Sequence, residues 1–395
     1  MQDSDTCPSV DVLVIGGGVM GASLATWLRL CDPSVSVALV ERDTTWTSAS
    51  SALSAASIRQ QFTTAVNIEI SRQSLALLRT AADWLSVEGD RPDLGFDEGG
   101  YLILAGAEGA PVLRQAHAIQ QAHAADVALF SPAQLHARFP WLHVRDLQLG
   151  SLGLSGEGWF DGYRLLSALT AKARHLGVHM VRGEVVSMMR DGRSVRDVRL
   201  ADGRGWSAGV VVNAAGPWAR GVASMAGLEV PVAANRRTVF VLDCPTPLPS
   251  CPLIVDTSGF WLRPDGPYFI GGVVPTDDAA DLPLEPDLAQ FEDSFWPALA
   301  HRIPAFEAVK VVRAWAGYYE INTFDHNGLV GLHPESDNFF LMNGFSGHGI
   351  QQAPAVGRAL AERILTGAYR SLDLAALSPS RVQHGAPLTE LAIIG

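Results

Sequence analysis

The chain has 395 residues, of which 48% are hydrophobic and 18% charged, and its formal net charge is −12. This composition excludes a disordered chain and supplies enough apolar material for a large core. The acidic balance argues against a nucleic-acid-binding protein, so no nucleic acid is expected as a partner. The four cysteines, Cys7, Cys31, Cys244 and Cys251, form neither a CxxC pair nor a zinc-type array, so we expect no metal site and a reducing compartment.

The start of the chain does not resemble a targeting segment. Its first ten residues, MQDSDTCPSV, are acidic and polar, which is the opposite of a signal or transit peptide. The longest apolar stretch, 12–27, contains four glycines and is too short to cross a bilayer, so no membrane span is expected. We therefore predict a soluble, cytoplasmic protein.

The first predicted elements form a βαβ unit. An apolar run at 11–15 (DVLVI) ends in glycines, helical apolar spacing follows over 19–30, and a second apolar run spans 35–41 (VSVALVE). Strand, glycine turn, helix and strand in this order predict a parallel sheet. A further helix is expected over 67–85.

The middle of the chain contains strand-like runs at 100–104, 237–242, 260–263 and 268–272. The last two flank Pro264-Asp265-Gly266, a turn sequence that is typical of an antiparallel hairpin.

Between and after these runs, parallel-type units return. A helix at 163–175 stops at Gly177, and strands are predicted at 178–186 and 210–212. Near the end, a strand at 339–342 leads through a glycine loop into a helix at 352–365.

This order predicts an α/β (α+β) fold with a discontinuous Rossmann-like domain and an inserted antiparallel-sheet domain. The nucleotide-binding domain is expected to comprise 1–90, 150–225 and 325–395, and the inserted domain 91–149 and 226–324. The interface between the two domains is the expected active site.

The first motif that carries chemistry is Gly16-x-Gly18-x-x-Gly21. Its glycines permit a tight turn and a close approach of the backbone to a pyrophosphate, which the helix N-terminus attracts. Glu41 closes the second strand, where a carboxylate accepts the ribose hydroxyls. An acid at this position disfavours NADP, whereas the motif leaves NAD and FAD open, and glycine triplets also occur in ordinary turns.

Two later segments also suit contact with a bound dinucleotide or flavin. The run VVVNAAGPW (210–218) ends a strand in small residues that let the backbone approach a dinucleotide from the far side, although such turns are also common elsewhere. The loop 344–349 (GFSGHG) precedes a helix, whose N-terminus would stabilise negative charge that develops on a reduced flavin.

Five segments in this order carry a resemblance to a known family: GGGVMG, SASSALSAASIRQQF, VVNAAGPWA, WAGYYEINTFDHNGLVG and NGFSGHGIQQAPAVGRALAE. The chain resembles the glycine oxidase/D-amino-acid oxidase superfamily of FAD-dependent enzymes, within it the sarcosine oxidase and dimethylglycine dehydrogenase branch. The stretch 315–361 is similar to a mitochondrial FAD-dependent oxidoreductase-domain protein of complex I assembly. The resemblance covers nearly the whole chain.

The resemblance implies non-covalently bound FAD, an inserted domain that binds the substrate, and a set of residues that hold the cofactor. These residues are Gly16, Gly18, Val19, Met20, Gly21, Glu41, Arg42, Ser50, Ser51, Val185, Ala215, Gly216, Gly344, Ser346, Gly347, His348, Gly349 and Ile350.

The resemblance also implies the reaction, which is oxidation of a C–N bond of an amino acid or secondary amine to an imine, with hydride transfer to flavin N5. The expected partners are a small amine or amino acid and either oxygen or an electron-acceptor protein. Arg59 matches an arginine near the substrate carboxylate, and its planar fork suits bidentate binding, although a surface ion pair is the alternative. Further candidates for catalytic residues are Arg263, Tyr318, His348 and Gln351. Trp261 and Tyr318 are either walls of an apolar pocket or ordinary core residues.

Two departures from the family pattern stand out. Sarcosine oxidases place a lysine where this chain has Gln351, and a neutral amide cannot supply charge to a carboxylate. Monomeric sarcosine oxidase links its flavin to a cysteine in the segment that matches Tyr318, and dimethylglycine dehydrogenase uses an early histidine. Neither residue is present here, hence the expectation of non-covalent FAD. Two other functions therefore stay open: oxidation of an unusual amine in a tailoring pathway, and a FAD-binding assembly role without amine oxidation.

Overall fold

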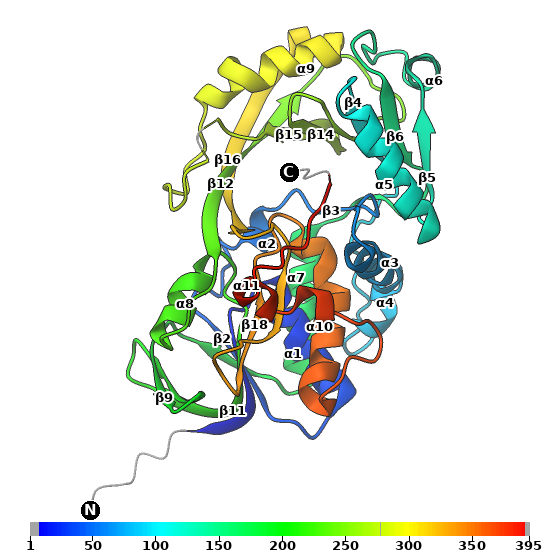
Figure 1. Cartoon of the computed structure of the whole chain (residues 1–395). Helices are drawn as coiled ribbons and strands as arrows, with labels where there is room; N and C mark the ends of the chain where they lie inside the picture. The colour runs from blue at the N-terminus through cyan, green and yellow to red at the C-terminus, as the bar shows by residue number, and fades with distance from the viewer. Residues whose placement is uncertain (1–7, 277, 392–395) are drawn as a thin grey trace, which may run out of the picture.

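The computed structural model describes residues 8–276 and 278–391. Most of the polar N-terminal segment, including Cys7, lies outside the described residues. Two eight-stranded sheets organise the chain, one in the lower and one in the upper half of Figure 1. The predicted α/β class is confirmed.

The first sheet has a mainly parallel centre. Its main path runs through β17 (Leu329–Leu332), β18 (Phe339–Asn343), β11 (Gly205–Asn213), β1 (Ser9–Ile15), β2 (Val37–Glu41) and β8 (His179–Arg182). An antiparallel extension of β11 adds β10 (Ser194–Leu200) and β9 (Val185–Asp191). Strands from the beginning, middle and end of the chain thus meet in one sheet.

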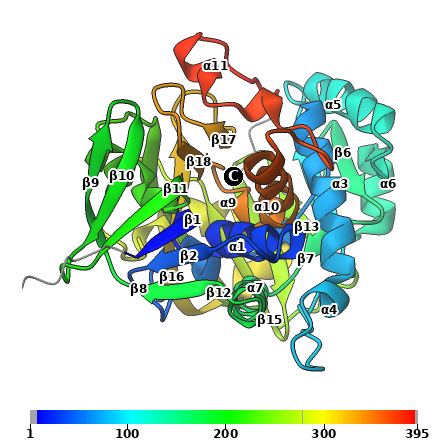
Figure 2. The ribbon, with the colours of Figure 1, turned by 90° about the horizontal axis from the view of Figure 1, so that it is seen from below.

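The two faces of this sheet are covered differently, because alternate side chains of a strand point to opposite faces. Val12 and Val14 of β1 belong to one apolar core, and Leu13 and Ile15 belong to another. The first core is formed mainly with α1 (Val19–Cys31), α3 (Ala65–Arg79), α7 (Gly162–His175) and α10 (Gly349–Thr366). Figure 2 shows α1 lying between α10 and α7. The second core includes residues of α8 (Ala219–Met225) and of the β9–β10 hairpin.

The second sheet is predominantly antiparallel. Its strands are ordered β16 (Lys310–Asn322), β12 (Val232–Asp243), β15 (Tyr268–Val273), β14 (Phe260–Asp265), β13 (Leu253–Val255), β4 (Tyr101–Ala105), β6 (Leu149–Gly153) and β5 (Val127–Phe130). Its accompanying helices are α5 (Ala110–Ala122), α6 (Pro132–Arg138) and α9 (Trp296–Arg302).

Several short elements complete the described chain. They are α2 (Ser50–Leu53), α4 (Ala81–Trp84), α11 (Ser380–Gln383), β3 (Ser57–Ile58) and β7 (Gly158–Trp159). Of these, α2 and β3 contribute to the region between the two sheets. Among the helices of the described residues, none is long and apolar enough to cross a membrane. The cytoplasmic localisation stays a prediction.

The structure corrects four local predictions. The helix expected at 67–85 is two helices, α3 and α4, which are separated at Thr80. The strand expected at 178–186 is divided into β8 and β9, which pair with different partners. The last long helix begins at Gly349 rather than at 352.

The fourth correction concerns the hairpin turn. Pro264 and Asp265 belong to β14, and Asp265 pairs with Tyr268, so the turn is Gly266-Pro267. The division into two domains stays a prediction. The predicted boundary at residue 150 falls inside β6. All five residues of that strand pair with strands of the second sheet.

Candidate active site

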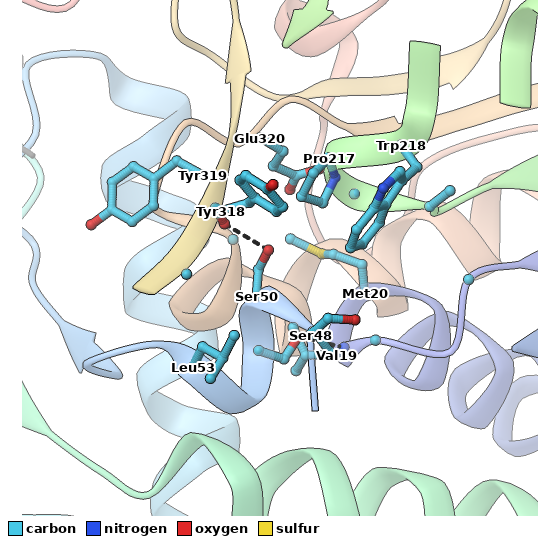
Figure 3. A pocket seen from close by; sticks show the side chains of 18 of the residues that line it. Val19, Met20, Ser48, Ser50, Leu53, Pro217, Trp218, Tyr318, Tyr319 and Glu320 are labelled. Atoms are coloured by element: carbon cyan, nitrogen blue, oxygen red, sulfur yellow. Dashed lines mark hydrogen bonds between the residues drawn. The ribbon is translucent and has the colours of Figure 1, made fainter. Parts of the chain in front are cut away.

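A large cavity of about 520 Å³ lies where the two sheets approach each other. Its lining combines the β1–α1 turn, the ends of β2 and β11, α2, the start of α10, and residues of β12 and β16. Figure 3 shows Met20, Trp218, Ser50 and Tyr318 around this space. The cavity therefore lies at the carboxyl ends of parallel strands, where α/β sheets bind nucleotides.

The β1–α1 turn is shaped for close approach. A Cβ atom at Gly21 would lie 1.9 Å from the carbonyl oxygen of Gly16, so only glycine permits the helix to pack this closely on the turn. The backbone N–H of Val19, in the first turn of α1, donates to Ser51 Oγ at 3.0 Å. The helix N-terminus thus faces the cavity with a partial positive charge, as pyrophosphate binding requires.

Glu41 lies at the end of β2, where its carboxylate is held by backbone donors. Its Oε2 accepts from Gly17 N at 2.7 Å and its Oε1 from Asp43 N at 2.8 Å. Both contacts fix the carboxylate at the cavity wall, where it can accept ribose hydroxyls. Turn, helix and acid together fit the adenosine diphosphate half of a dinucleotide.

Most of the cofactor-binding residues predicted from the sequence line this cavity. They are Gly16, Gly18, Val19, Met20, Glu41, Arg42, Ser50, Ser51, Val185, Ala215, Gly216, Gly347, Gly349 and Ile350. Gly21, Gly344, Ser346 and His348 do not line it; the first three shape the backbone around it, and His348 lines a second, smaller cavity. Ser346, for example, has a φ of 50°, and its hydroxyl accepts from Asn322 N and donates to Gly344 O.

Other lining residues were not singled out from the sequence. Trp218 lies at the end of the quoted AAGPW segment, and the guanidinium of Arg42 stacks 3.9 Å from its ring centroid. Tyr319 and Glu320 directly follow Tyr318 in WAGYYE. Proximity to a motif was the only available signal for these three residues.

Glu320 is a half-buried acid beside the loop that precedes α10. Its Oε2 accepts from Gly344 N at 3.2 Å. Burial raises the pKa of Glu320 to about 7, and the backbone N–H groups of Gly344 and Phe345 act in the opposite direction. The carboxyl is therefore positioned to change its protonation state near neutral pH at the cavity wall.

A second, smaller cavity of about 60 Å³ adjoins the first. Four residues line both: Ala55, Trp261, Tyr319 and Gly347. The polar part of the smaller cavity comes from Ser57, Arg59, Tyr101, His348 and Gln351, and its apolar part includes Leu253 and Val255. A small molecule in this cavity would lie beside a cofactor bound in the large one.

Arg59 is the basic residue of the small cavity and is 2% exposed. Its Nη2 lies 2.8 Å from His348 Nε2, and its guanidinium lies 4.5 Å from the ring centroid of Phe62. Within the described structure, its Nη1 is buried and has no hydrogen-bond partner. Because an unpaired buried donor is costly, this atom marks a position where an anionic ligand would be stabilised.

Gln351 supports Arg59 in a way that the sequence did not indicate. Its Oε1 accepts from the backbone N–H of Arg59 at 2.9 Å. The side chain of Gln351 therefore fixes the backbone that carries the arginine.

The other two candidates have structural contacts. The Nε and Nη2 atoms of Arg263 donate to Ala55 O, and its Nη1 donates to Pro264 O and Asp265. Arg263 does not line either cavity, so its geometry does not support the predicted contact with substrate. Tyr318 lines the large cavity, but its hydroxyl donates to Leu282 O at 2.6 Å.

Behind Arg59 lies another buried acid, Glu157. Its carboxylate accepts from Gln60 N and from Gln61 Nε2. Burial raises the pKa of Glu157 to about 7, and the hydrogen bonds to Gln60 and Gln61 and the charge of Arg59 oppose this shift. Sequence reasoning missed this residue, because a glutamate in a polar stretch looks like an exposed charge.

The fold and the large cavity are those of a dinucleotide-binding protein, and the small cavity adjoins the dinucleotide cavity. A family model described as FAD dependent oxidoreductase (DAO) matches residues 11–363. The chain belongs to this family, which confirms the resemblance inferred from its motifs and identifies it as a FAD-dependent oxidoreductase. The residues described above fit the cofactor, and non-covalent attachment stays a prediction.

Individual relatives agree with this assignment. The chain is 39% identical to FAD-dependent oxidoreductase domain-containing protein 1 of Xenopus laevis, covering 97% of this chain and 85% of the relative. It is 28% identical to mitochondrial dimethylglycine dehydrogenase of Mus musculus, covering 94% of this chain and 44% of the relative. The structure of L-proline dehydrogenase from P. horikoshii has a TM-score of 0.86 at 24% identity, with coverage of 97% and 100%. This last likeness concerns the fold.

Proposed function

We propose that the protein oxidises the C–N bond of a small amino acid or secondary amine, of the N-methyl or cyclic amino-acid type, to an imine. The observation that carries this proposal is the buried guanidinium of Arg59, whose Nη1 is unpaired, in a cavity that adjoins the dinucleotide cavity. A carboxylate is the ligand group that an arginine binds most specifically.

The size and lining of the small cavity support a compact substrate. Its apolar walls include Leu253, Val255 and Trp261, and Arg59 supplies the positive charge. With its carboxylate at Arg59, an amino acid would be oriented, and its α-carbon would be held away from bulk water. Two relatives are named for substrates of this kind, dimethylglycine and L-proline.

The reaction requires little acid–base chemistry from the protein. FAD, when bound, supplies the hydride acceptor. The substrate loses a hydride from the carbon beside nitrogen, and the nitrogen lone pair forms the C=N bond. Oxygen or an electron-acceptor protein then takes the two electrons. Arg59 binds and orients the substrate, and Tyr319 lines both cavities.

The test is anaerobic reduction of the purified holoprotein, followed by its visible spectrum. N-methyl, cyclic and primary amino acids are compared, and sarcosine is paired with sarcosinamide, which lacks the carboxylate. We expect one class of amino acid to bleach the flavin and each matched amide to act roughly a hundredfold more slowly or worse. Bleaching by amide and acid alike would overturn the role of Arg59.

A flavin that no amine bleaches would contradict the proposal and favour the tailoring or assembly roles instead. Acid precipitation of the same sample tests the attachment of the cofactor. Release of the flavin into the supernatant is expected for non-covalent binding, and flavin retained in the pellet would refute it.

A further inference from the structure

The contact between Arg59 and His348 defines the protonation state and the tautomer of the imidazole. The two nitrogens, Arg59 Nη2 and His348 Nε2, are 2.8 Å apart. A guanidinium offers only donors, so Nε2 of His348 must accept this hydrogen bond. The ring is therefore neutral and carries its proton on Nδ1.

The surroundings of the pair are consistent with a neutral ring. Arg59, Tyr101 and Tyr319 line the small cavity together with His348, and Glu320, on β16, accepts from Gly344 N in the loop before α10. The ring of Phe62 meets the imidazole edge-on, with centroids 5.1 Å apart. Protonation of the ring would place two positive charges at hydrogen-bond distance in a buried region, which is strongly unfavourable.

Arg59 needs such a fixed partner, because its side chain is long and loses much rotamer freedom when it is held in one position. Four contacts restrict it: Gln351 at its backbone, the faces of Phe62 and Tyr101, and His348 at Nη2. Of these, only the His348 contact is a hydrogen bond to the guanidinium head. The position of the head therefore depends on an acceptor at Nε2.

We propose that His348 is a positioning residue that, as a neutral hydrogen-bond acceptor, holds the guanidinium of Arg59 ready for a ligand carboxylate. This inference rests on the proposed function in one respect, namely that the small cavity binds a carboxylate. It assigns His348 to the substrate side of the site, whereas the sequence placed it in the flavin environment.

The test is a double-mutant cycle on the holoprotein, with 2-furoate as a carboxylate probe that has no amine to oxidise. Its dissociation constant is measured by titration calorimetry and by the change in the flavin spectrum. We expect His348→Leu to weaken binding roughly tenfold, because the acceptor is lost. His348→Gln should stay within about threefold of the wild type, since the amide oxygen replaces the Nε2 acceptor.

In an Arg59→Met background, the same His348→Leu change should have little further effect, because the two residues act as one unit. An equal loss in both backgrounds would show a merely structural role and overturn the proposal. His136→Gln, a change at an exposed histidine of α6, is the matched control and should leave binding unchanged.

Nitrogen NMR of the imidazole gives a readout that is independent of any ligand. A neutral ring with its proton on Nδ1 is expected, and an imidazolium or the opposite tautomer would refute the assignment. If furoate binds through Arg59 but no amine reduces the flavin, the proposed function fails and this inference stands. If amines reduce the flavin and Arg59→Met weakens furoate binding but His348→Leu does not, this inference fails alone.

Discussion

The large and small cavities adjoin each other, yet they are built by different means. The cofactor side of the large cavity depends on backbone: a glycine turn, helix N-termini and carbonyl groups at strand ends. The small cavity depends on side chains from β3, β4, β13, β14, β16 and the start of α10, and from the loops beside them. The first arrangement suits a cofactor shared by many enzymes, and the second suits discrimination among substrates. Four changes test this contrast.

The largest effect is expected from Gly21→Ala. The added Cβ would lie 1.9 Å from Gly16 O, and because this atom belongs to the backbone, the turn itself must move. We expect the flavin content of the purified protein to fall roughly tenfold or more. The ratio of flavin absorbance to protein absorbance measures this flavin content. Gly106→Ala is the control and should retain its flavin, because Gly106 lines neither cavity and an added Cβ would meet only Asp146 O, at an ordinary 3.7 Å.

The next largest effect is expected at Arg59, in the small cavity. Arg59→Met removes the charged donors and should weaken binding of a carboxylate ligand about a hundredfold, since two charged hydrogen bonds contribute about 3 kcal/mol. Flavin content should not change, and titration with 2-furoate gives the dissociation constant. Arg263→Met is the matched control: it should lower stability without changing furoate affinity, because Arg263 bonds to Ala55 and Asp265. Loss of affinity in this control would restore Arg263 as a substrate contact.

We expect the free energy of unfolding to depend on pH through Glu157. Its folded pKa of about 7 lies above the usual value of 4.5, so its contribution to stability is fully present below pH 4.5. This contribution is lost as the pH rises through about 7, and its full size is on the order of 3 kcal/mol. Glu157→Gln should therefore reduce the difference in unfolding free energy between acid and neutral pH, measured by urea denaturation. An identical pH dependence in both proteins would contradict the assignment.

The smallest effect is expected from Tyr318→Phe. The hydroxyl of Tyr318 donates to Leu282 O, so its removal should lower the unfolding free energy by about 1 kcal/mol. The rate of flavin reduction by substrate should change by no more than a few fold, because this hydroxyl is already bonded within the protein. A loss of a hundredfold or more in that rate would make Tyr318 a catalytic residue after all.

Much of the cofactor site could be predicted from short stretches of sequence. The turn 16–21, the acid Glu41 and the loop 344–349 each combine glycine or charge with a neighbouring strand or helix, and such patterns depend on local backbone geometry. The division of 67–85 and of 178–186 was missed, because continuous apolar spacing does not reveal where a helix breaks or a strand changes partners.

The sequence by itself therefore determined the fold class, the discontinuous order of its elements and the cofactor. Only the tertiary structure decided how the small cavity works. Arg59 was proposed through a family resemblance, but its partner His348 lies 289 residues away in the chain. Gln351 was interpreted as a weak substitute for lysine, whereas it holds the Arg59 backbone. The burial of Glu157 could not be predicted from the sequence either. Side-chain pairing and desolvation arise from packing between distant segments, and no local pattern in the sequence encodes either of them.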